Sequence, residues 1–89
     1  MNRELVATAM MGQDAEDFVK SNIGRYLVGC AEQEKEEALV ALSGVLPWRR
    51  RRIQELQNKI WRSDSFLQWI SELILTGRQA IQTLDEKEE

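Results

Sequence analysis

Histidine is absent from this chain of 89 residues, and cysteine and proline each occur once, as Cys30 and Pro47. The chain therefore has no imidazole base to activate a nucleophile and no His or Cys spacing of the kind that binds a metal ion. It also has no glycine-rich phosphate loop. From these absences we predict a protein that is not an enzyme and that uses no catalytic residue, cofactor or metal.

The single cysteine also excludes an internal disulfide, and we interpret Cys30 as a small core residue. The first residues lack the basic flank, apolar stretch and small-residue cleavage site of a secretory signal. No uncharged apolar run is long enough to span a bilayer. We therefore expect a soluble intracellular protein with no membrane partner.

The composition indicates a small folded domain. With 43% hydrophobic and 30% charged residues, the chain is too apolar for a disordered protein and too charged for a membrane protein. A single core of this size contributes only a few kcal/mol, and small domains commonly gain the remainder by oligomerisation. Size alone therefore favours a partner.

The second half of the chain carries a heptad seam, in which positions alternately three and four residues apart are mostly large and aliphatic. Its members are Ile53, Leu56, Ile60, Ser63, Leu67, Ile70, Ile74, Gly77, Ile81 and Leu84. A seam in register over more than four heptads is typical of a helix that wraps a partner. Ser65 and Gln68 form a capping-box pattern that could start a new helix, but the apolar phase does not shift there. We therefore predict one continuous helix with a polar layer at Ser63.

The apolar stripes and turn residues predict an all-α fold in a single domain, residues 1–89. We expect a short N-terminal helix over 1–12, a helix over 14–43 that could kink or restart near 21–24, a long helix over 47–86 and an acidic tail over 87–89. Gly44 and Pro47 mark a tight turn, so the two longer helices should form an antiparallel hairpin. The predicted architecture is this hairpin, packed as an oligomeric helical bundle.

The end of the long helix has apolar residues around much of its circumference. If the hairpin turns near position 45, Ile23 lies opposite Leu67, and the seam extends past the second helix. The first helix, residues 18 and 19, or another subunit could cover that extension. Because a stripe this broad is typical of a buried helix, we predict a homo-oligomer. The predicted interface residues are Trp61, Phe66, Trp69, Leu73, Ile74, Ile81 and Leu84.

Four consecutive arginines, Arg49, Arg50, Arg51 and Arg52, form an arginine block that follows Trp48. Cations at the start of a helix are disfavoured by the helix dipole, so helix propensity does not explain the block. Trp48 and the arginines could hold phosphate, as in a nucleic-acid contact. Alternatively, they could pair with Glu36 and Glu37 or with an acidic neighbour. We favour pairing, because the chain has a net charge of −3 and only one basic cluster.

Residues 53–81 contain a Leu-Gln pair followed by Trp61, Trp69, Gly77 and Ala80. Together with residues 18–31, this pattern resembles small helical proteins encoded in the structural-gene regions of tailed bacteriophages and prophages. The resemblance covers about half of the chain and implies a virion-associated or assembly protein, located in the cytoplasm of a bacterial host or in the virion. Its implied partners are further copies of itself and other phage structural proteins.

Two alternative functions remain open at this point. The chain could be a small nucleic-acid-binding or regulatory protein that uses the arginine block. It could also be a helical inhibitor that places its last helix in the groove of a host or phage protein.

Overall fold

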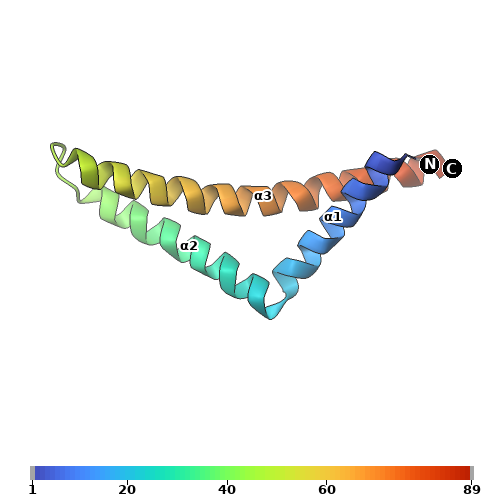
Figure 1. Ribbon diagram of the computed structural model, residues 1–89, viewed down its shortest axis with the longest axis horizontal. Coiled ribbons are helices and arrows are strands. Elements are labelled where there is room, and N and C mark those ends of the chain that lie inside the picture. The colour runs from blue at the N-terminus through green and yellow to red at the C-terminus, as the bar shows by residue number, and fades with distance from the viewer. Residues whose placement is uncertain (1, 89) are drawn as a thin grey trace. The chain divides into compact units, whose positions relative to one another are not determined.

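The computed structural model describes residues 2–88 and contains three helices, α1 (Arg3–Lys20), α2 (Asn22–Ser43) and α3 (Arg50–Glu88) (Figure 1). These residues include no strand, and α3 packs against both other helices, so the all-α prediction is confirmed. The chain forms two compact units where we predicted one domain. Unit 1 consists of Met1–Arg25 and Trp69–Glu89, and unit 2 of Tyr26–Gln68. Met1 and Glu89, at the ends of the predicted ranges, lie outside the described residues.

The long helix α3 is continuous through Ser63 and the capping-box pattern at Ser65 and Gln68, as predicted. Its predicted start at position 47 is wrong. The backbone N–H of Arg49 donates to the carbonyl of Leu46 at 3.0 Å, which closes a turn around Pro47 and Trp48. Proline favours the second position of such a turn because its φ is already close to the required value. The helix therefore begins at Arg50, and its last described turn includes residues 87 and 88, where we predicted a tail.

The first helix does not end at Gly12, so the predicted boundary at position 12 is wrong. α1 continues to Lys20, and the chain is interrupted at Ser21, within residues 21–24. The Ser21 hydroxyl donates to the carbonyl of Phe18 at 2.6 Å and accepts the backbone N–H of Gly24 at 3.0 Å. One side chain thus caps the end of α1 and the start of α2, so of the two alternatives at residues 21–24, a kink or a restart, the chain restarts as a new helix.

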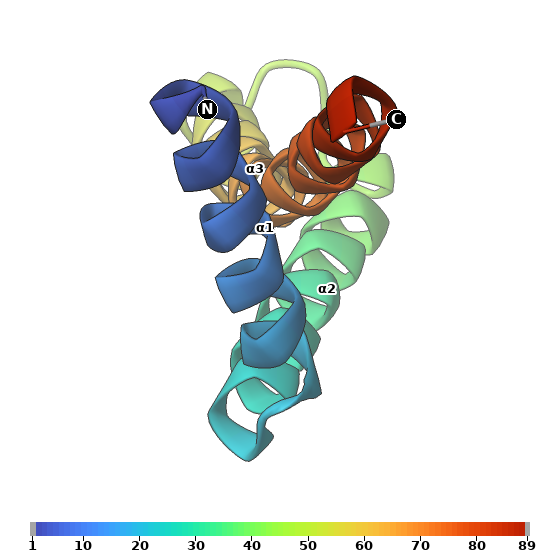
Figure 2. The same ribbon diagram turned by 90° about the vertical axis from the view of Figure 1, so that its right-hand side faces the viewer.

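Unit 1 is held together by close backbone contact between α1 and the second half of α3. A Cβ added to Gly77 would lie 2.6 Å from the Cα of Gly12, so neither position has room for a side chain. Ala15 and Ala80 are also buried in this unit. In Figure 2 the ends of α1 and α3 stand apart at the N and C labels, and the helices approach each other below them. Of the candidates proposed to cover the end of the seam, α1 packs there, and it includes Phe18 and Val19.

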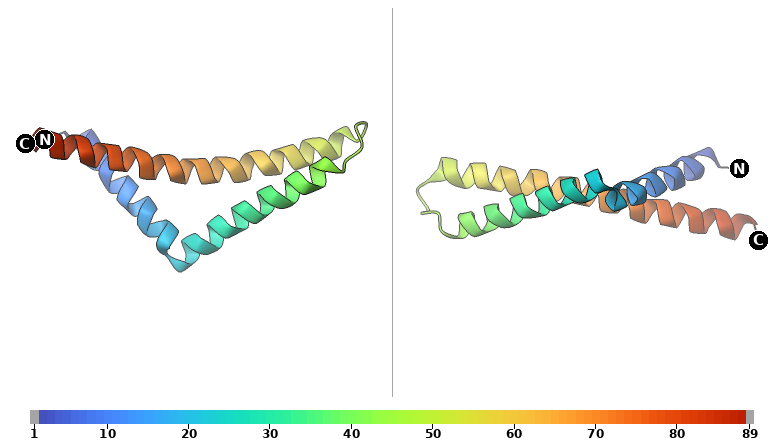
Figure 3. Two further views of the ribbon diagram at one scale, coloured as in Figure 1. Left: turned by 180° about the vertical axis from the view of Figure 1, so that it is seen from behind. Right: turned by 90° about the horizontal axis from the view of Figure 1, so that it is seen from below.

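Unit 2 is an antiparallel hairpin of α2 and the first half of α3, closed by the loop over residues 44–49 (Figure 3). Leu56 and Ala38 are its buried apolar residues, at 2% and 3% exposure, and Ser63 is buried at 2%. The predicted hairpin and its polar layer at Ser63 are confirmed. The predicted turn near position 45 is wrong, because Glu34 contacts Arg62 and Ser63, which centres the hairpin about residues 48 and 49.

Cys30 is exposed on α2, so its interpretation as a core residue is wrong. Leu27 lies one turn away and is also exposed, at 39%. The helical stripe that contains Leu27 is therefore covered near Ala38 and open near its N-terminal end.

Candidate interaction surfaces

The polar layer of unit 2 joins α2 to α3 through charged hydrogen bonds. Arg62 donates through Nε to Oε2 of Glu34 at 3.2 Å and through Nη2 to Oε1 of the same carboxylate. The Ser63 hydroxyl donates to Oε2 of Glu34 at 2.8 Å. The hydrogen bond from Arg62, followed by that from Ser63, lowers the pKa of the Glu34 carboxyl, because both stabilise its charged form.

A second ion pair flanks this layer, between Nζ of Lys35 and Oδ1 of Asp64 at 2.7 Å. In this layer each carboxylate accepts hydrogen bonds from a cation of the facing helix. The layer therefore sets the register of the hairpin.

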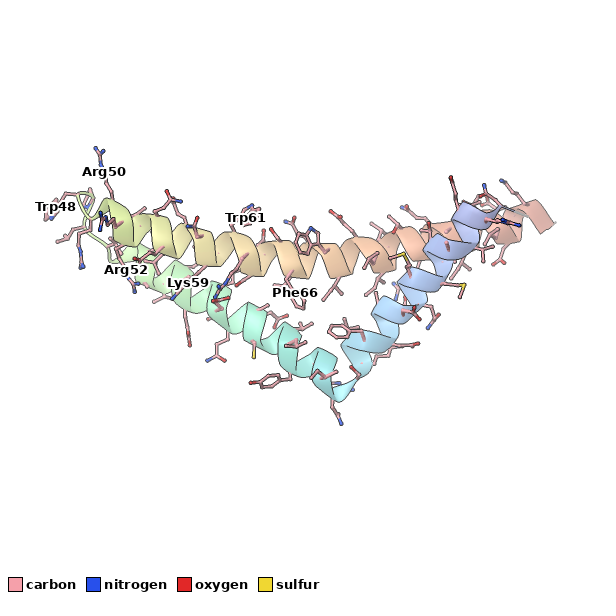
Figure 4. All side chains as sticks on the ribbon, in the orientation of Figure 1. Trp48, Arg50, Arg52, Lys59, Trp61 and Phe66 are labelled. Carbon is pink, nitrogen blue, oxygen red and sulfur yellow. The ribbon has the colours of Figure 1, made fainter. Side chains whose placement is uncertain are left out.

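Apolar side chains remain exposed on α3 in both units. In unit 2, Trp61 is 71% exposed and Phe66 is half-buried, and in Figure 4 they extend from opposite sides of the helix. In unit 1, Trp69 and Ile81 are exposed by 62% and 42%. The other predicted interface residues of this unit are half-buried, namely Leu73, Ile74 and Leu84.

Two open hollows lie beside these apolar residues. In unit 1, a hollow of about 330 Å³ is lined by Trp69, Glu72, Leu73 and Thr76. In unit 2, a hollow of about 440 Å³ lies between α2 and α3, and its lining is Leu27, Cys30, Ala31, Glu34, Arg62, Ser63 and Phe66. The sequence did not predict that Leu27 and Cys30 line this hollow. The charged residue Glu34, within an apolar stripe, was the available signal that this part of the stripe is open.

The arginine block surrounds the start of α3, and all four side chains are exposed. Arg52 pairs with Glu55 through Nη1 and Oε2 at 3.4 Å, one turn along the same helix. Among residues 2–88, the other three arginines form no ion pair, and no pair joins the block to Glu36 or Glu37. The predicted pairing within the chain is therefore not observed.

The start of α3 is also without a side-chain cap. Arg49 precedes the helix, and its carbonyl accepts the first helical N–H, that of Ile53, at 3.1 Å. A guanidinium has no acceptor atom, so Arg49 cannot cap the amides that follow it. Trp48 is 73% exposed beside the block, and in Figure 4 it lies at the tip of the loop, with Arg50 and Arg52 on different sides of the helix. Trp48, the arginine block and Glu55 line an open hollow of about 420 Å³.

The part of the chain that the structure describes contains no group of three or more His, Cys, Asp or Glu side chains placed to hold a metal ion. No helix within those residues combines the length and the apolar composition needed to cross a membrane. Comparisons with known protein families, with curated proteins and with solved structures find no significant match to this chain.

Proposed function

We propose that this chain is a non-enzymatic structural or assembly protein that works by helix–helix association with itself. The observation that supports this proposal is the contrast between its core and its surface. Four apolar residues are buried among those described, and three of them are alanine: Ala15, Ala38, Leu56 and Ala80. Among the same described residues, thirteen large apolar side chains are exposed by 39% or more. A chain of this size that leaves so many apolar groups in water is typical of a subunit.

The two exposed tryptophans of α3 are the strongest candidates for contact residues. Tryptophan buries a large apolar area with few rotatable bonds and is enriched among the residues that dominate binding energy at protein interfaces. Covering the exposed part of Trp61 or Trp69 would contribute about 3 kcal/mol each, before the entropy cost of association. Neither indole lies on the heptad seam, so both remain free for a second chain after the seam is occupied.

The biological setting that we propose is a tailed bacteriophage or prophage, in the virion or during its assembly. It rests on the resemblance of residues 53–81 to small helical proteins from phage structural-gene regions. A protein of that kind needs binding surfaces and no catalytic site, which agrees with helices whose apolar residues face solvent.

The test is the molecular mass in solution, measured by light scattering over a range of micromolar concentrations. We expect a mass of at least twice the 10.3 kDa of one chain. Replacing Trp61 and Trp69 by Glu should return the mass to 10.3 kDa while circular dichroism stays helical, because both side chains are exposed in the folded units.

Gln57 and Gln79 supply matched controls, since both are exposed residues of α3, one in each unit, and their replacement by Glu adds the same charge. The Gln57→Glu and Gln79→Glu double variant should keep the oligomer mass. A wild-type chain that remains monomeric at high micromolar concentration would contradict the proposal. A helical inhibitor would instead be monomeric alone and gain stability with a different protein.

A further inference from the structure

We propose that Trp48 and the arginine block form a binding site for single-stranded nucleic acid. In this site the guanidinium groups bind phosphates and the indole stacks on a base. The inference is independent of the proposed self-association, because none of these five residues belongs to the predicted oligomer interface.

Charge is strongly segregated at this site. Residues 38–54 contain the four arginines and no Asp or Glu, in a chain whose net charge is −3. The only acidic residue that lines the hollow is Glu55, and it is already paired with Arg52. A polyanion therefore meets a local excess of positive charge at this end of unit 2.

The guanidinium groups are free to bind. Arg49, Arg50 and Arg51 form no ion pair within the described residues, and the Arg52 pair is long, at 3.4 Å, between exposed groups. Successive helical residues are about 100° apart around the axis, so the four side chains extend in different directions from the end of the helix. That arrangement suits a flexible strand of phosphates curving around a helix end. Contact with one face of an acidic helix would need the basic residues three or four positions apart, and within the block only Arg49 and Arg52 are so spaced.

Trp48 favours nucleic acid over an acidic protein surface as the partner. Its indole is 73% exposed and lines the same hollow as the arginines. Aromatic side chains within a basic surface are typical of proteins that bind single strands, because every base has a face on which an indole can stack. Bases within a duplex are already stacked on each other, so a single strand fits this site better.

The proposal is tested by fluorescence anisotropy with a labelled DNA oligonucleotide of about 16 nucleotides and mixed sequence, using the full chain. Four phosphate contacts predict a slope of about −2.8 in a plot of log affinity against log salt, or about a 50-fold loss between 50 and 200 mM salt. Replacing all four arginines by Gln should abolish binding. The matched control replaces four exposed basic residues elsewhere by Gln, namely Arg3, Lys20, Arg25 and Lys87. Its affinity for the oligonucleotide should fall by less than about 3-fold.

The role of Trp48 is tested by two variants of the same residue. Trp48→Ala should weaken binding by about 10-fold or more, whereas Trp48→Phe retains an aromatic face and should stay within about 3-fold of the wild type. Neither variant should change the molecular mass in solution, which separates this proposal from that of self-association.

Several results would overturn the proposal. One is the absence of binding at low salt, and another is equal binding by the arginine variant and its control. Tighter binding of duplex than of single-stranded DNA, with no effect of Trp48→Ala, would also overturn it. If a poly-glutamate peptide binds in an arginine-dependent manner and the oligonucleotide does not, the site contacts acidic protein.

Discussion

The two units of this chain use the same helix α3 but pack against it by different physical means. In unit 1, α1 and α3 touch at Gly12 and Gly77, with no space for a side chain between their backbones. In unit 2, α2 and α3 are separated by Leu56 and by the hydrogen bonds of Glu34 with Arg62 and Ser63. The helix packing of unit 1 therefore depends on two positions without a side chain, Gly12 and Gly77. The helix packing of unit 2 depends on one large apolar residue and a polar layer.

The difference shows which changes each unit can tolerate. A glycine contact depends on shape and fails when any atom is added. A contact through Leu56 fails when atoms are removed, because the cavity is only partly filled by relaxation. A polar layer contributes less to stability and more to register, because its groups are also hydrogen-bonded to water in the unfolded chain.

The largest effect should follow from Leu56→Ala, which removes the most buried large side chain, at 2% exposure. We expect a loss of about 3 kcal/mol in the free energy of unfolding, from lost burial and the remaining cavity. Urea denaturation followed by circular dichroism would measure it. Val40→Ala is the control, because Val40 is 68% exposed in the same unit and should cost less than about 0.5 kcal/mol. Equal effects of the two variants would contradict this description of the core.

Gly77→Ala should have the next largest effect, because the new Cβ would lie 2.6 Å from the Cα of Gly12 and 3.3 Å from the carbonyl of Thr8. We expect a net loss of about 2 kcal/mol, mainly through separation of α1 from α3. Gly29→Ala is a matched control, since its Cβ meets nothing within 4 Å in the middle of α2. That variant should gain up to about 1 kcal/mol from helix propensity. Hydrogen exchange of the α1 amides distinguishes the two, and unchanged protection in Gly77→Ala would argue against the close contact.

The smallest effect concerns Glu34→Gln in the polar layer, and it should depend on pH. The pKa of Glu34 is lowered in the folded chain, so its charged form adds stability above the ordinary value of about 4.3. That stability is lost as the pH falls through the lower, folded pKa. We expect the variant to lose at most about 1 kcal/mol at pH 7 and to lose less than that near pH 3.

Thermal unfolding at the two pH values measures this difference between Glu34→Gln and the wild type. Glu32→Gln is the control, because Glu32 is exposed and forms no ion pair among the described residues. A loss in Glu34→Gln that persists unchanged near pH 3 would mean that packing of the side chain matters and its charge does not.

Periodicity predicted much of the fold. The heptad phase kept across Ile60 and Leu67 correctly indicated one helix through Ser63, although a capping pattern lay beside it. The residues around Ser21 correctly marked an interruption. Boundaries that depend on glycine or proline were predicted less well. Glycine commonly follows a helix end and proline commonly begins a helix, but in this chain Gly12 lies inside α1 and Pro47 lies in the loop before α3.

The candidate surfaces also have some features that the sequence predicts and others that it does not. The arginine block and the tryptophans off the seam are visible in the sequence, because their character is local. The ion pairs of the arginines are not visible in the sequence, because they depend on which carboxylates the hairpin brings within about 4 Å. A shift of the turn by a few residues changes every partner. The exposure of Cys30 and Leu27 is equally non-local, because a helical stripe is buried only where a neighbour lies close enough to cover it.

By itself, the sequence determined the helical class, the continuity of α3 and the position of its polar layer, because these follow from side-chain character repeated along one helix. Only the tertiary structure decided that Gly12 faces Gly77 and that Glu34 accepts from Arg62 and Ser63. It also decided that three of the four arginines form no ion pair with the side chains that the structure describes. Each of those outcomes depends on the distance between segments far apart in the chain. Periodicity specifies which face of a helix is apolar, but it leaves open which atoms of another helix come to meet it.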